Sequence, residues 1–201
     1  IFTGGPASVT DPGAPVCDPE VFELGIPVLG ICYGMQLMGT MLGGSVEKAR
    51  HREYGKVAIS LDGTSRLFRG AEGDTTCWMS HTYHISSLPE GFRGTACTQN
   101  CAVASMENPS GMLYAVQFHP EVMHTPRGKE ILKNFLYGIC GCSGDWEMAS
   151  FVRESIQKIR EKVGDKSVLC ALSGGVDSSV AAVLMNKAVG RQLTCIFVDH
   201  G

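Results

Sequence analysis

Cys32 lies between two glycines, Gly30 and Gly34, at the point where an apolar segment ends and a helical pattern begins. This G-x-C-x-G spacing follows the steric logic of a nucleophile elbow, in which small flanking residues allow a sharp turn from strand to helix. The amino end of the helix favours a thiolate there, because exposed amides and the helix dipole stabilise negative charge. The pattern predicts a nucleophilic cysteine, and the alternative is a buried cysteine between packing glycines.

A second apolar segment ends in His119, and Glu121 follows two residues later. A cysteine nucleophile needs a base within hydrogen-bond reach, and the base needs an acceptor that orients it. In extended chain, residues at i and i+2 project to the same side, so Glu121 can reach the His119 ring. Taken alone, His119 is better explained as a surface histidine at a strand end. Together with Cys32, it indicates a Cys-His-Glu triad.

Two glycine-rich turns follow apolar segments. The first, residues 3–6, reads Thr-Gly-Gly-Pro and either faces its amides toward an anion or is an ordinary tight turn. The second, residues 173–179, reads Ser-Gly-Gly-Val-Asp-Ser-Ser before a helix rich in Ala and Val. Glycines, hydroxyls and a helix amino end together favour a phosphate site, although a simple helix-capping turn is the alternative. The loop is not a Walker sequence, because it has no lysine.

Strand-like and helix-like segments alternate around these residues. Apolar runs bounded by Gly or Pro predict buried strands, and 3.6-residue periodicity predicts helices. The expected strands are residues 1–2, 27–31, 112–118, 167–172 and 193–198, and the expected helices are residues 33–42, 128–137, 146–163 and 178–188. The alternation predicts an α/β fold with largely parallel sheets, to which residues 56–104 add antiparallel strands.

A small polar stretch, residues 141–145, is the predicted linker between a domain of residues 1–140 and a second domain of residues 146–201. The charge balance of 17 Lys and Arg against 20 Asp and Glu gives no indication of a nucleic-acid or anionic-membrane surface. No run of about 18 apolar residues predicts a membrane span, and no signal-peptide pattern is present.

The chain has nine cysteines, an odd number scattered through apolar stretches. This distribution indicates free and mostly buried thiols in a reducing cytoplasm. Cys140 and Cys142 lack the CxxC spacing of a zinc site and have no matching second pair, so we predict no metal site.

The motifs TGGP, GICYGMQ and QFHPEV, in this order, closely resemble the triad-type (class I) glutamine amidotransferases over residues 1–140. The resemblance implies an open mixed sheet with flanking helices. It implies that Cys32 attacks the glutamine side-chain amide, that His119 acts as base and then acid, and that Glu121 orients His119. Glutamine hydrolysis by this route needs no cofactor.

The same resemblance implies binding roles for three further residues. Gly5 and Tyr33 would donate backbone amides to the oxyanion, and Gln36 would help seat glutamine. The family's first strand, before the glycine turn, is expected to lie outside these residues. Residues 80–83 read SHTY where related sequences commonly read SHGD, so we assign them no role, and residues 52–55 fit a family segment or a surface turn equally well.

Residues 173–179 resemble the pyrophosphate loop of the N-type ATP pyrophosphatases, which implies that residues 146–201 form the first β-α-β of a Rossmann-like domain. The implied ATP-binding residues are Ser173, Gly174, Gly175, Val176, Asp177, Ser178 and Ser179, with Mg²⁺ offsetting the phosphate charge. Residues 197–201 resemble the second strand of that fold, near which the family binds adenine.

An amidotransferase followed directly by this loop resembles the GMP synthase family, which are ligases. The resemblance implies that glutamine, ATP and XMP are substrates, that ammonia aminates adenylated XMP, and that the enzyme is a cytoplasmic homodimer. We expect the chain to be incomplete at both ends and unable to make GMP by itself. The alternatives are a non-catalytic or regulatory amidotransferase-like module and a γ-glutamyl hydrolase, although the latter leaves residues 146–201 unexplained.

Overall fold

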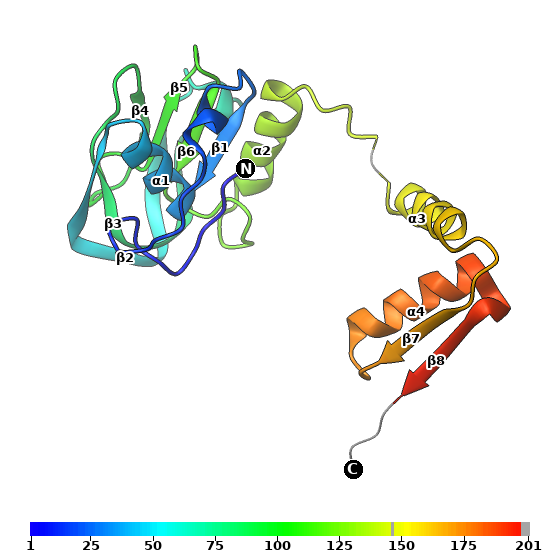
Figure 1. The fold of residues 1–201 in the computed structure, drawn as a ribbon. Coiled ribbons are helices and arrows are strands. Elements are labelled where there is room, and N and C mark those ends of the chain that lie inside the picture. Colours follow the sequence, from blue (N-terminus) through cyan, green and yellow to red (C-terminus); the bar gives the residue numbers. More distant parts are fainter. Residues whose placement is uncertain (146, 198–201) are drawn as a thin grey trace. The chain divides into compact units, whose positions relative to one another are not determined.

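The computed structural model describes residues 1–145 and 147–197. The chain divides into two compact units, Ile1–Ser143 and Gly144–Gly201, which Figure 1 shows in sequence colours. The division falls inside the stretch of residues 141–145 that the composition suggests as a linker.

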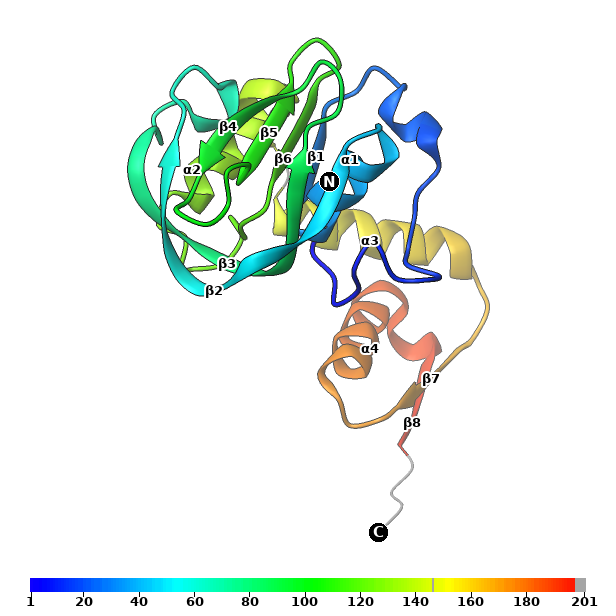
Figure 2. The ribbon, with the colours of Figure 1, turned by 90° about the vertical axis from the view of Figure 1, so that its left-hand side faces the viewer.

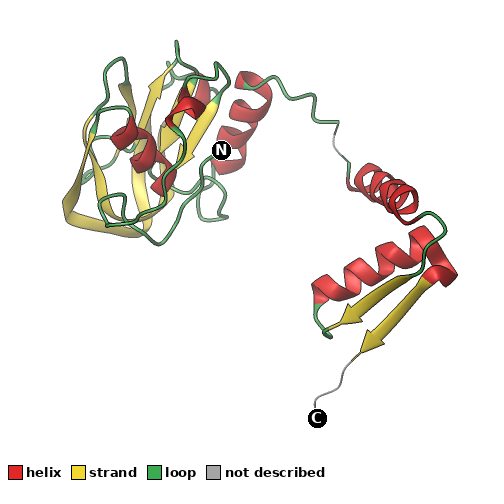
Figure 3. Cartoon of the chain, in the orientation of Figure 1, coloured by secondary structure: helices red, strands yellow, loops and turns green. Residues whose placement is uncertain are grey.

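The first unit contains a six-stranded sheet in the order β1-β6-β5-β4-β2-β3. Several of its strands run side by side in Figure 2, and Figure 3 distinguishes strands from helices. The strands are β1 Val28–Ile31, β2 Ser45–Leu61, β3 Gly73–Ser87, β4 Arg93–Cys97, β5 Ser105–Asn108 and β6 Leu113–Val116. Phe2 forms a parallel bridge with Gly30 on β1, so the expected initial strand is represented by this bridge.

The helical segments of the first unit cover both faces of the sheet. They are the 3₁₀ turns η1 Pro19–Phe22 and η2 Arg66–Phe68, the α-helices α1 Tyr33–Met41 and α2 Gly128–Lys133, and the π-helical turn η3 Asn134–Ile139. In Figure 1, α1 and α2 lie on opposite sides of β1 and β6. The expected helix over residues 128–137 is therefore two segments, because the backbone changes from α to π geometry at Asn134.

Two apolar clusters fill the spaces between the sheet and the helices. Along β6, Tyr114 and Val116 join the cluster that includes Ile131 of α2, whereas Leu113 and Ala115 join the cluster beneath α1. Successive side chains of a strand point to opposite faces, so β6 contributes to both clusters and is buried at every position. Strand β1 is also buried throughout, which explains why both segments read as continuous apolar runs.

The expected open mixed sheet is confirmed, but the expectation of largely parallel pairing is wrong for this unit. Among the described strands of the sheet, β1 and β6 are parallel, and the other neighbouring strands pair antiparallel. The reason is that chain segments without a crossover helix connect β2 through β6, and such connections suit antiparallel neighbours. The antiparallel part also begins earlier than expected, at Ser45.

The second unit contains α3 Met148–Val163, β7 Val168–Leu172, α4 Val176–Val189, the 3₁₀ turn η4 Gly190–Gln192 and β8 Leu193–Phe197. Strands β7 and β8 are parallel and joined through α4, which confirms the expected β-α-β unit. Residues 198–201, which the sequence assigns to the end of the second strand, lie outside the described residues.

The cysteines depart from the sequence-based expectation. All nine are free, but only Cys32, Cys77 and Cys101 are buried, while Cys97, Cys142 and Cys195 are exposed. The expectation of mostly buried thiols is wrong, because apolar neighbours in the sequence do not ensure that a side chain points into the core. In the part of the chain that the structure describes, no helix combines the length and apolar character needed to cross a membrane.

Candidate active site

Cys32 stands at a sharp turn between β1 and α1. Its backbone has φ 52° and ψ −105°, a conformation that residues with a side chain rarely adopt. A Cβ at Gly30 would lie 2.6 Å from the Gly34 carbonyl oxygen, and a Cβ at Gly34 would lie 2.5 Å from the Phe2 carbonyl oxygen. Glycine is therefore required on both sides of Cys32, and the turn has the geometry that the G-x-C-x-G spacing predicts.

Parallel pairing brings the histidine segment beside the cysteine. Ile31 of β1 and Val116 of β6 are register partners, and the Cys32 N–H donates to the Val116 carbonyl oxygen at 2.8 Å. The chain continues from β6 into Gln117, whose Nε2 lies 3.7 Å from the Cys32 Sγ. Both segments leave the sheet at the carboxyl ends of adjacent parallel strands, the usual position of functional groups in such sheets.

His119 and Glu121 form a close pair. The Nδ1 atom of His119 lies 2.7 Å from Oε1 of Glu121. The pKa of His119 is raised to about 9, mainly by a side-chain hydrogen bond with Cys32, with Glu121 adding to the rise and burial opposing it. Each of the three residues predicted as a triad is thus in electrostatic or hydrogen-bond contact with the next.

The backbone of His119 is held by residues that the sequence did not single out. Its N–H donates to the Trp78 carbonyl oxygen at 3.0 Å, and its carbonyl oxygen accepts the Thr125 hydroxyl at 2.6 Å. The Thr125 hydroxyl oxygen also accepts the Trp78 N–H at 3.0 Å. Thr125 is buried and joins β3 to the histidine segment. No sequence pattern identifies it, since its partners are backbone groups.

The first glycine turn lies directly against the triad. A Cβ at Gly4 would lie 2.9 Å from Cε1 of His119 and 3.7 Å from Cβ of Cys32. A Cβ at Gly5 would make only ordinary contacts with the Tyr33 ring, at 3.8 Å. Tyr33 is the first residue of α1, where a backbone N–H has no acceptor within the helix. The family resemblance implies Gly5 and Tyr33 as oxyanion donors but does not point to Gly4, where the absence of a side chain leaves room for His119.

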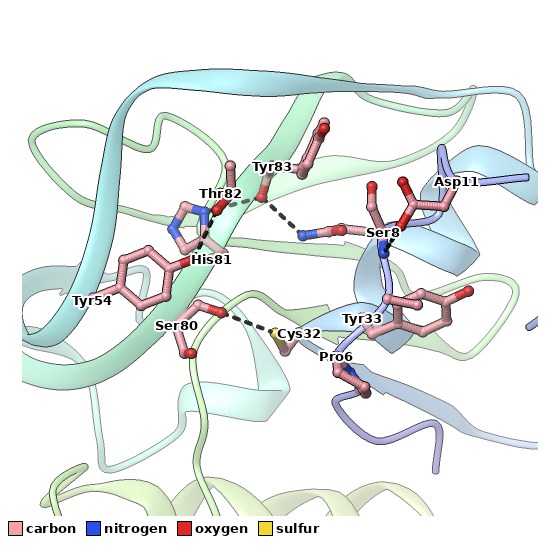
Figure 4. A pocket seen from close by; sticks show the side chains of 13 residues that line it. Pro6, Ser8, Asp11, Cys32, Tyr33, Tyr54, Ser80, His81, Thr82 and Tyr83 are labelled. Carbon is pink, nitrogen blue, oxygen red and sulfur yellow. Dashed lines mark hydrogen bonds between the residues drawn. The ribbon is translucent and has the colours of Figure 1, made fainter. Parts of the chain in front are cut away.

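A pocket of about 250 Å³ opens above Cys32. One wall is formed by residues 5–8 with Asp11, and the opposite wall by Tyr54 and residues 80–83. Figure 4 shows the Cys32 sulfur between these walls, where its thiol donates to the Ser80 carbonyl oxygen at 3.7 Å. Residues 80–83, to which the sequence assigned no role, are therefore part of the pocket.

Gln36 lines the same pocket but is almost fully buried. Its Nε2 donates to the Tyr83 carbonyl oxygen at 2.9 Å and to Oε1 of Gln117 at 3.1 Å. These bonds hold its amide nitrogen in the pocket wall. Direct contact between Gln36 and a substrate remains a prediction.

In the second unit, residues 173–179 form the turn between β7 and the start of α4. Gly174 has φ 78°, and Gly175 is the extended N-cap of α4. The hydroxyls of Ser178 and Ser179 donate to the Gly175 carbonyl oxygen, at 3.1 and 2.9 Å. The loop is thus closed by its own serines, while the helix amides face outward from the first turn. The described segment therefore has the local geometry of an anion site.

The larger unit matches a known protein family. Residues 1–139 match the family model for glutamine amidotransferase class-I. The chain belongs to the class-I glutamine amidotransferase family. Residues 147–198 of this amidotransferase match the model for NAD synthase.

Curated relatives match over all 201 residues of this amidotransferase. It is 73% identical to the GMP synthase [glutamine-hydrolyzing] of Acetivibrio thermocellus and 70% identical to that of Ruminiclostridium cellulolyticum. The chain spans 39% of the length of each of these relatives.

Solved structures share the fold of the amidotransferase unit. A putative GMP synthase subunit from Thermoplasma acidophilum is 38% identical, with a TM-score of 0.57 over 69% of this chain and 64% of that one. A glutamine amido transferase from Methylobacillus flagellatus is 22% identical, with a TM-score of 0.50 over 72% of this chain and 61% of that one. At that identity, the second likeness concerns the fold alone.

Proposed function

We propose that residues 1–140 hydrolyse glutamine to glutamate and ammonia, with Cys32 as nucleophile and His119 and Glu121 as its partners. The observation that carries this proposal is that Cys32 and His119 both border the space at Gly4, where a Cβ would lie 3.7 Å from Cys32 Cβ and 2.9 Å from His119 Cε1, while His119 pairs with Glu121 beside a pocket. Family membership supports the reaction class. A non-catalytic module would have no need to keep all three residues in contact around a strained elbow.

The proposed reaction proceeds in two halves. The Cys32 thiol passes its proton to His119, the resulting thiolate attacks the side-chain amide carbon of glutamine, and the oxyanion that forms is met by the backbone amides of Gly5 and Tyr33. The tetrahedral intermediate collapses, His119 gives its proton to the departing nitrogen, and ammonia leaves. Water then attacks the glutamyl thioester while His119 takes a proton from it, and glutamate is released with the thiol regenerated. Each oxyanion donor of this kind is typically worth about 3 kcal/mol of barrier reduction.

The raised pKa of His119 suits the first half of this reaction. A pKa of about 9, maintained mainly by the hydrogen bond with Cys32, keeps the imidazole protonated at neutral pH. The proton that the amide nitrogen needs is therefore already present on His119 before attack. Glu121 accepts from Nδ1, so the remaining ring nitrogen is left to exchange the proton with the reacting groups.

We further propose that the whole protein is a glutamine-hydrolysing GMP synthase. In the second reaction, an oxygen of XMP attacks the α-phosphorus of ATP and releases pyrophosphate, and ammonia then displaces AMP to give GMP. The identity of 73% to a protein of that name over the full chain supports this assignment. A γ-glutamyl hydrolase would leave the match of residues 147–198 unexplained. A homodimeric state and a cytoplasmic location are predictions of the same resemblance.

The loop of residues 173–179 fits a phosphate group held mainly by backbone. Because Ser178 and Ser179 donate their hydroxyls to Gly175, the amides at the amino end of α4 are the donors that face outward. Binding of pyrophosphate would use the amides of Gly174 to Ser178, with Ser173, Val176, Asp177 and Ser179 completing the loop. Mg²⁺ would offset the phosphate charge, and Asp177 is the carboxylate positioned to help hold it.

The proposal is tested with an electrophilic glutamine analogue, such as a γ-glutamyl diazoketone or chloroketone. This reagent is expected to alkylate Cys32 and none of the other eight cysteines, with free glutamine protecting the site. Peptide mass spectrometry locates the adduct, and a coupled assay measures glutamate release. Labelling spread over the exposed thiols, with no protection by glutamine, would refute a built glutamine site.

A further inference from the structure

A buried ionisable pair includes one residue of the pocket wall, His81. Glu53 of β2 and His81 of β3 are register partners, and both side chains are almost fully buried. The His81 Nε2 lies 3.2 Å from Oε2 of Glu53, and Thr98 donates its hydroxyl to Oε1 of Glu53 at 2.8 Å. Such a pair is costly to bury and is a weak source of net stability, so its position calls for a reason other than packing.

The pair is linked to the nucleophile through an unbroken series of hydrogen bonds. Nδ1 of His81 lies 3.0 Å from the Tyr83 carbonyl oxygen and must carry a proton there, because a carbonyl can only accept. The same oxygen accepts Nε2 of Gln36. Gln36 in turn donates to Gln117, and Gln117 donates to the sulfur of Cys32. The Tyr83 carbonyl is therefore held by His81 and by Gln36 at the same time.

The pair also stabilises an irregularity of the strands. Lys48 of β2 pairs with Tyr83, and the next regular pair is Glu53 with His81, so β2 has more residues than β3 in this interval. The extra residues form a bulge directly opposite the segment that lines the pocket. The Glu53–His81 contact is where β2 returns to register, so it determines where residues 80–83 lie.

A metal ion is the competing explanation, since Glu53, His81 and Cys101 bring ligand atoms within 4.8 Å of one another. However, the thiol of Cys101 already donates to the Val103 carbonyl oxygen at 3.3 Å. Burial, with Glu53 adding to the effect, raises the pKa of Cys101 to about 12, so a metal would have to displace the proton of a thiol that the fold keeps protonated. Both carboxylate oxygens of Glu53 also have partners.

We propose that Glu53 and His81 are positioning residues of the glutamine site. They act through the Tyr83 carbonyl and the side-chain amides of Gln36 and Gln117, and they fix the position of the pocket wall relative to the Cys32 sulfur. This inference rests on the proposed glutaminase reaction. His81 belongs to the pocket wall, and Glu53, which does not line the pocket, holds the His81 ring in place. Their loss misplaces the substrate relative to the sulfur without removing a reacting group.

The test compares two replacements of Glu53 in the full-length protein. In Glu53→Gln, the new amide can accept from Thr98 and donate to Nε2 of His81, so the series of hydrogen bonds persists. In Glu53→Met, both hydrogen bonds are lost, although the methionine side chain has a volume similar to that of glutamate. Glu107→Met is the matched control, since Glu107 is an equally buried carboxylate of the same sheet that bonds Ser65 and Arg93 away from the pocket.

The measured quantities are the rates of Cys32 alkylation by the glutamine-mimicking electrophile and by iodoacetamide, together with KM and kcat for glutamine. Glu53→Met is expected to slow the glutamine-directed alkylation by about tenfold, while iodoacetamide reacts at nearly the wild-type rate. Glu53→Gln and Glu107→Met should retain the wild-type ratio of the two rates. An unchanged ratio in Glu53→Met would overturn the inference. If the wild type itself failed to react with the glutamine mimic, the proposed function would be at fault instead.

A second pair of variants keeps the test decisive if Glu53→Met does not fold. The amide of Asn occupies the place of Nδ1 in histidine, and the amide of Gln reaches the place of Nε2. His81→Asn therefore keeps the hydrogen bond to the Tyr83 carbonyl and loses the one to Glu53. His81→Gln keeps the hydrogen bond to Glu53 and loses the one to the Tyr83 carbonyl. We expect His81→Asn to retain more of the glutamine-directed rate than His81→Gln, with equal iodoacetamide rates. The reverse order would mean that the pair serves only to support the sheet.

Discussion

Ile31 and Val116 are register partners in the parallel pair β1 and β6, and this alignment places Cys32 beside the segment that carries Gln117 and His119. The segments that carry Cys32 and His119 are far apart in the sequence and meet because adjacent parallel strands end at the same edge. Several measurable consequences depend on this local geometry.

The space at Gly4 admits the ring of His119, the proposed base. Gly4→Ala places a Cβ 2.9 Å from Cε1 of His119, so the ring must move away from Cys32. We expect glutamine hydrolysis to fall by about a hundredfold, the scale of a one-ångström misplacement, with thermal stability little changed. Gly5→Ala is the matched control, because its Cβ meets Tyr33 at an ordinary 3.8 Å and its N–H is retained. Equal activities of the two variants would contradict this role for Gly4.

The strained backbone at Cys32 predicts an unusual order of stabilities. Cys32→Ala keeps a side chain at φ 52°, whereas Cys32→Gly removes the steric penalty, which is of order 1–3 kcal/mol for such conformations. Both variants should lose glutamine-dependent activity and retain any ammonia-dependent synthesis. In thermal unfolding, Cys32→Gly should be at least as stable as Cys32→Ala, although glycine normally destabilises. A lower melting temperature for Cys32→Gly would show that the elbow stores no strain.

The pKa of His119 is expected to depend more on Cys32 than on Glu121. The hydrogen bond with Cys32 is the largest cause of the rise of this pKa to about 9. Burial lowers the pKa, and Glu121 raises it by less than Cys32 does. Because the pKa is raised in the folded state, the associated stability is present below the unfolded pKa and is lost as pH rises through about 9. NMR titration of His119 should therefore show a larger downward shift in Cys32→Ala than in Glu121→Gln.

Enzyme kinetics provide a separate check on Glu121. Glu121→Gln should lower kcat less than His119→Ala, since Glu121 orients the imidazole and transfers no proton. The alkaline limb of the pH–activity profile of Glu121→Gln should move to lower pH, because His119 holds its proton less tightly in this variant. A Glu121→Gln variant that is folded but as inactive as His119→Ala would mean that the roles are misassigned.

Thr125 is expected to matter although it touches no reacting group. Thr125→Val leaves the His119 carbonyl and the Trp78 N–H without their buried partner, which typically costs about 1–3 kcal/mol per group. We expect a lower melting temperature and a lower kcat for glutamine, and Thr125→Ser should restore both because the hydroxyl returns. Restored stability without restored kcat would limit Thr125 to a structural role.

The two glycines of the phosphate loop should respond differently to substitution. Gly174 has φ 78°, so Gly174→Val strains the loop itself, whereas a Cβ at Gly175 meets Ser173 Oγ at an ordinary 3.6 Å. Gly175→Val should therefore leave the fold intact but block close approach of phosphate to the backbone. ATP–pyrophosphate exchange with XMP and Mg²⁺ is expected to be lost in Gly175→Val while Cys32 still reacts with the glutamine mimic. Wild-type exchange in folded Gly175→Val would remove the loop from the ATP site.

The sequence by itself determined the local chemistry of this protein. Gly30 is dictated by its contact with Gly34 a few residues later, and the i, i+2 spacing of His119 and Glu121 brings them together without distant help. Buried strands β1 and β6 were readable because both faces of each are covered, which leaves uninterrupted apolar runs. Local propensity and local sterics are sufficient for features of this kind.

Only the tertiary structure decided what surrounds the nucleophile. The pairing of β2 with β3, its bulge, and the Glu53–His81 contact depend on register between distant segments, which residue types along one segment do not specify. The same holds for Thr125 and Gly4, whose importance lies in backbone groups and empty space contributed by other parts of the chain. The sequence therefore predicts the reacting groups of the proposed reaction, and long-range packing determines the pocket beside them.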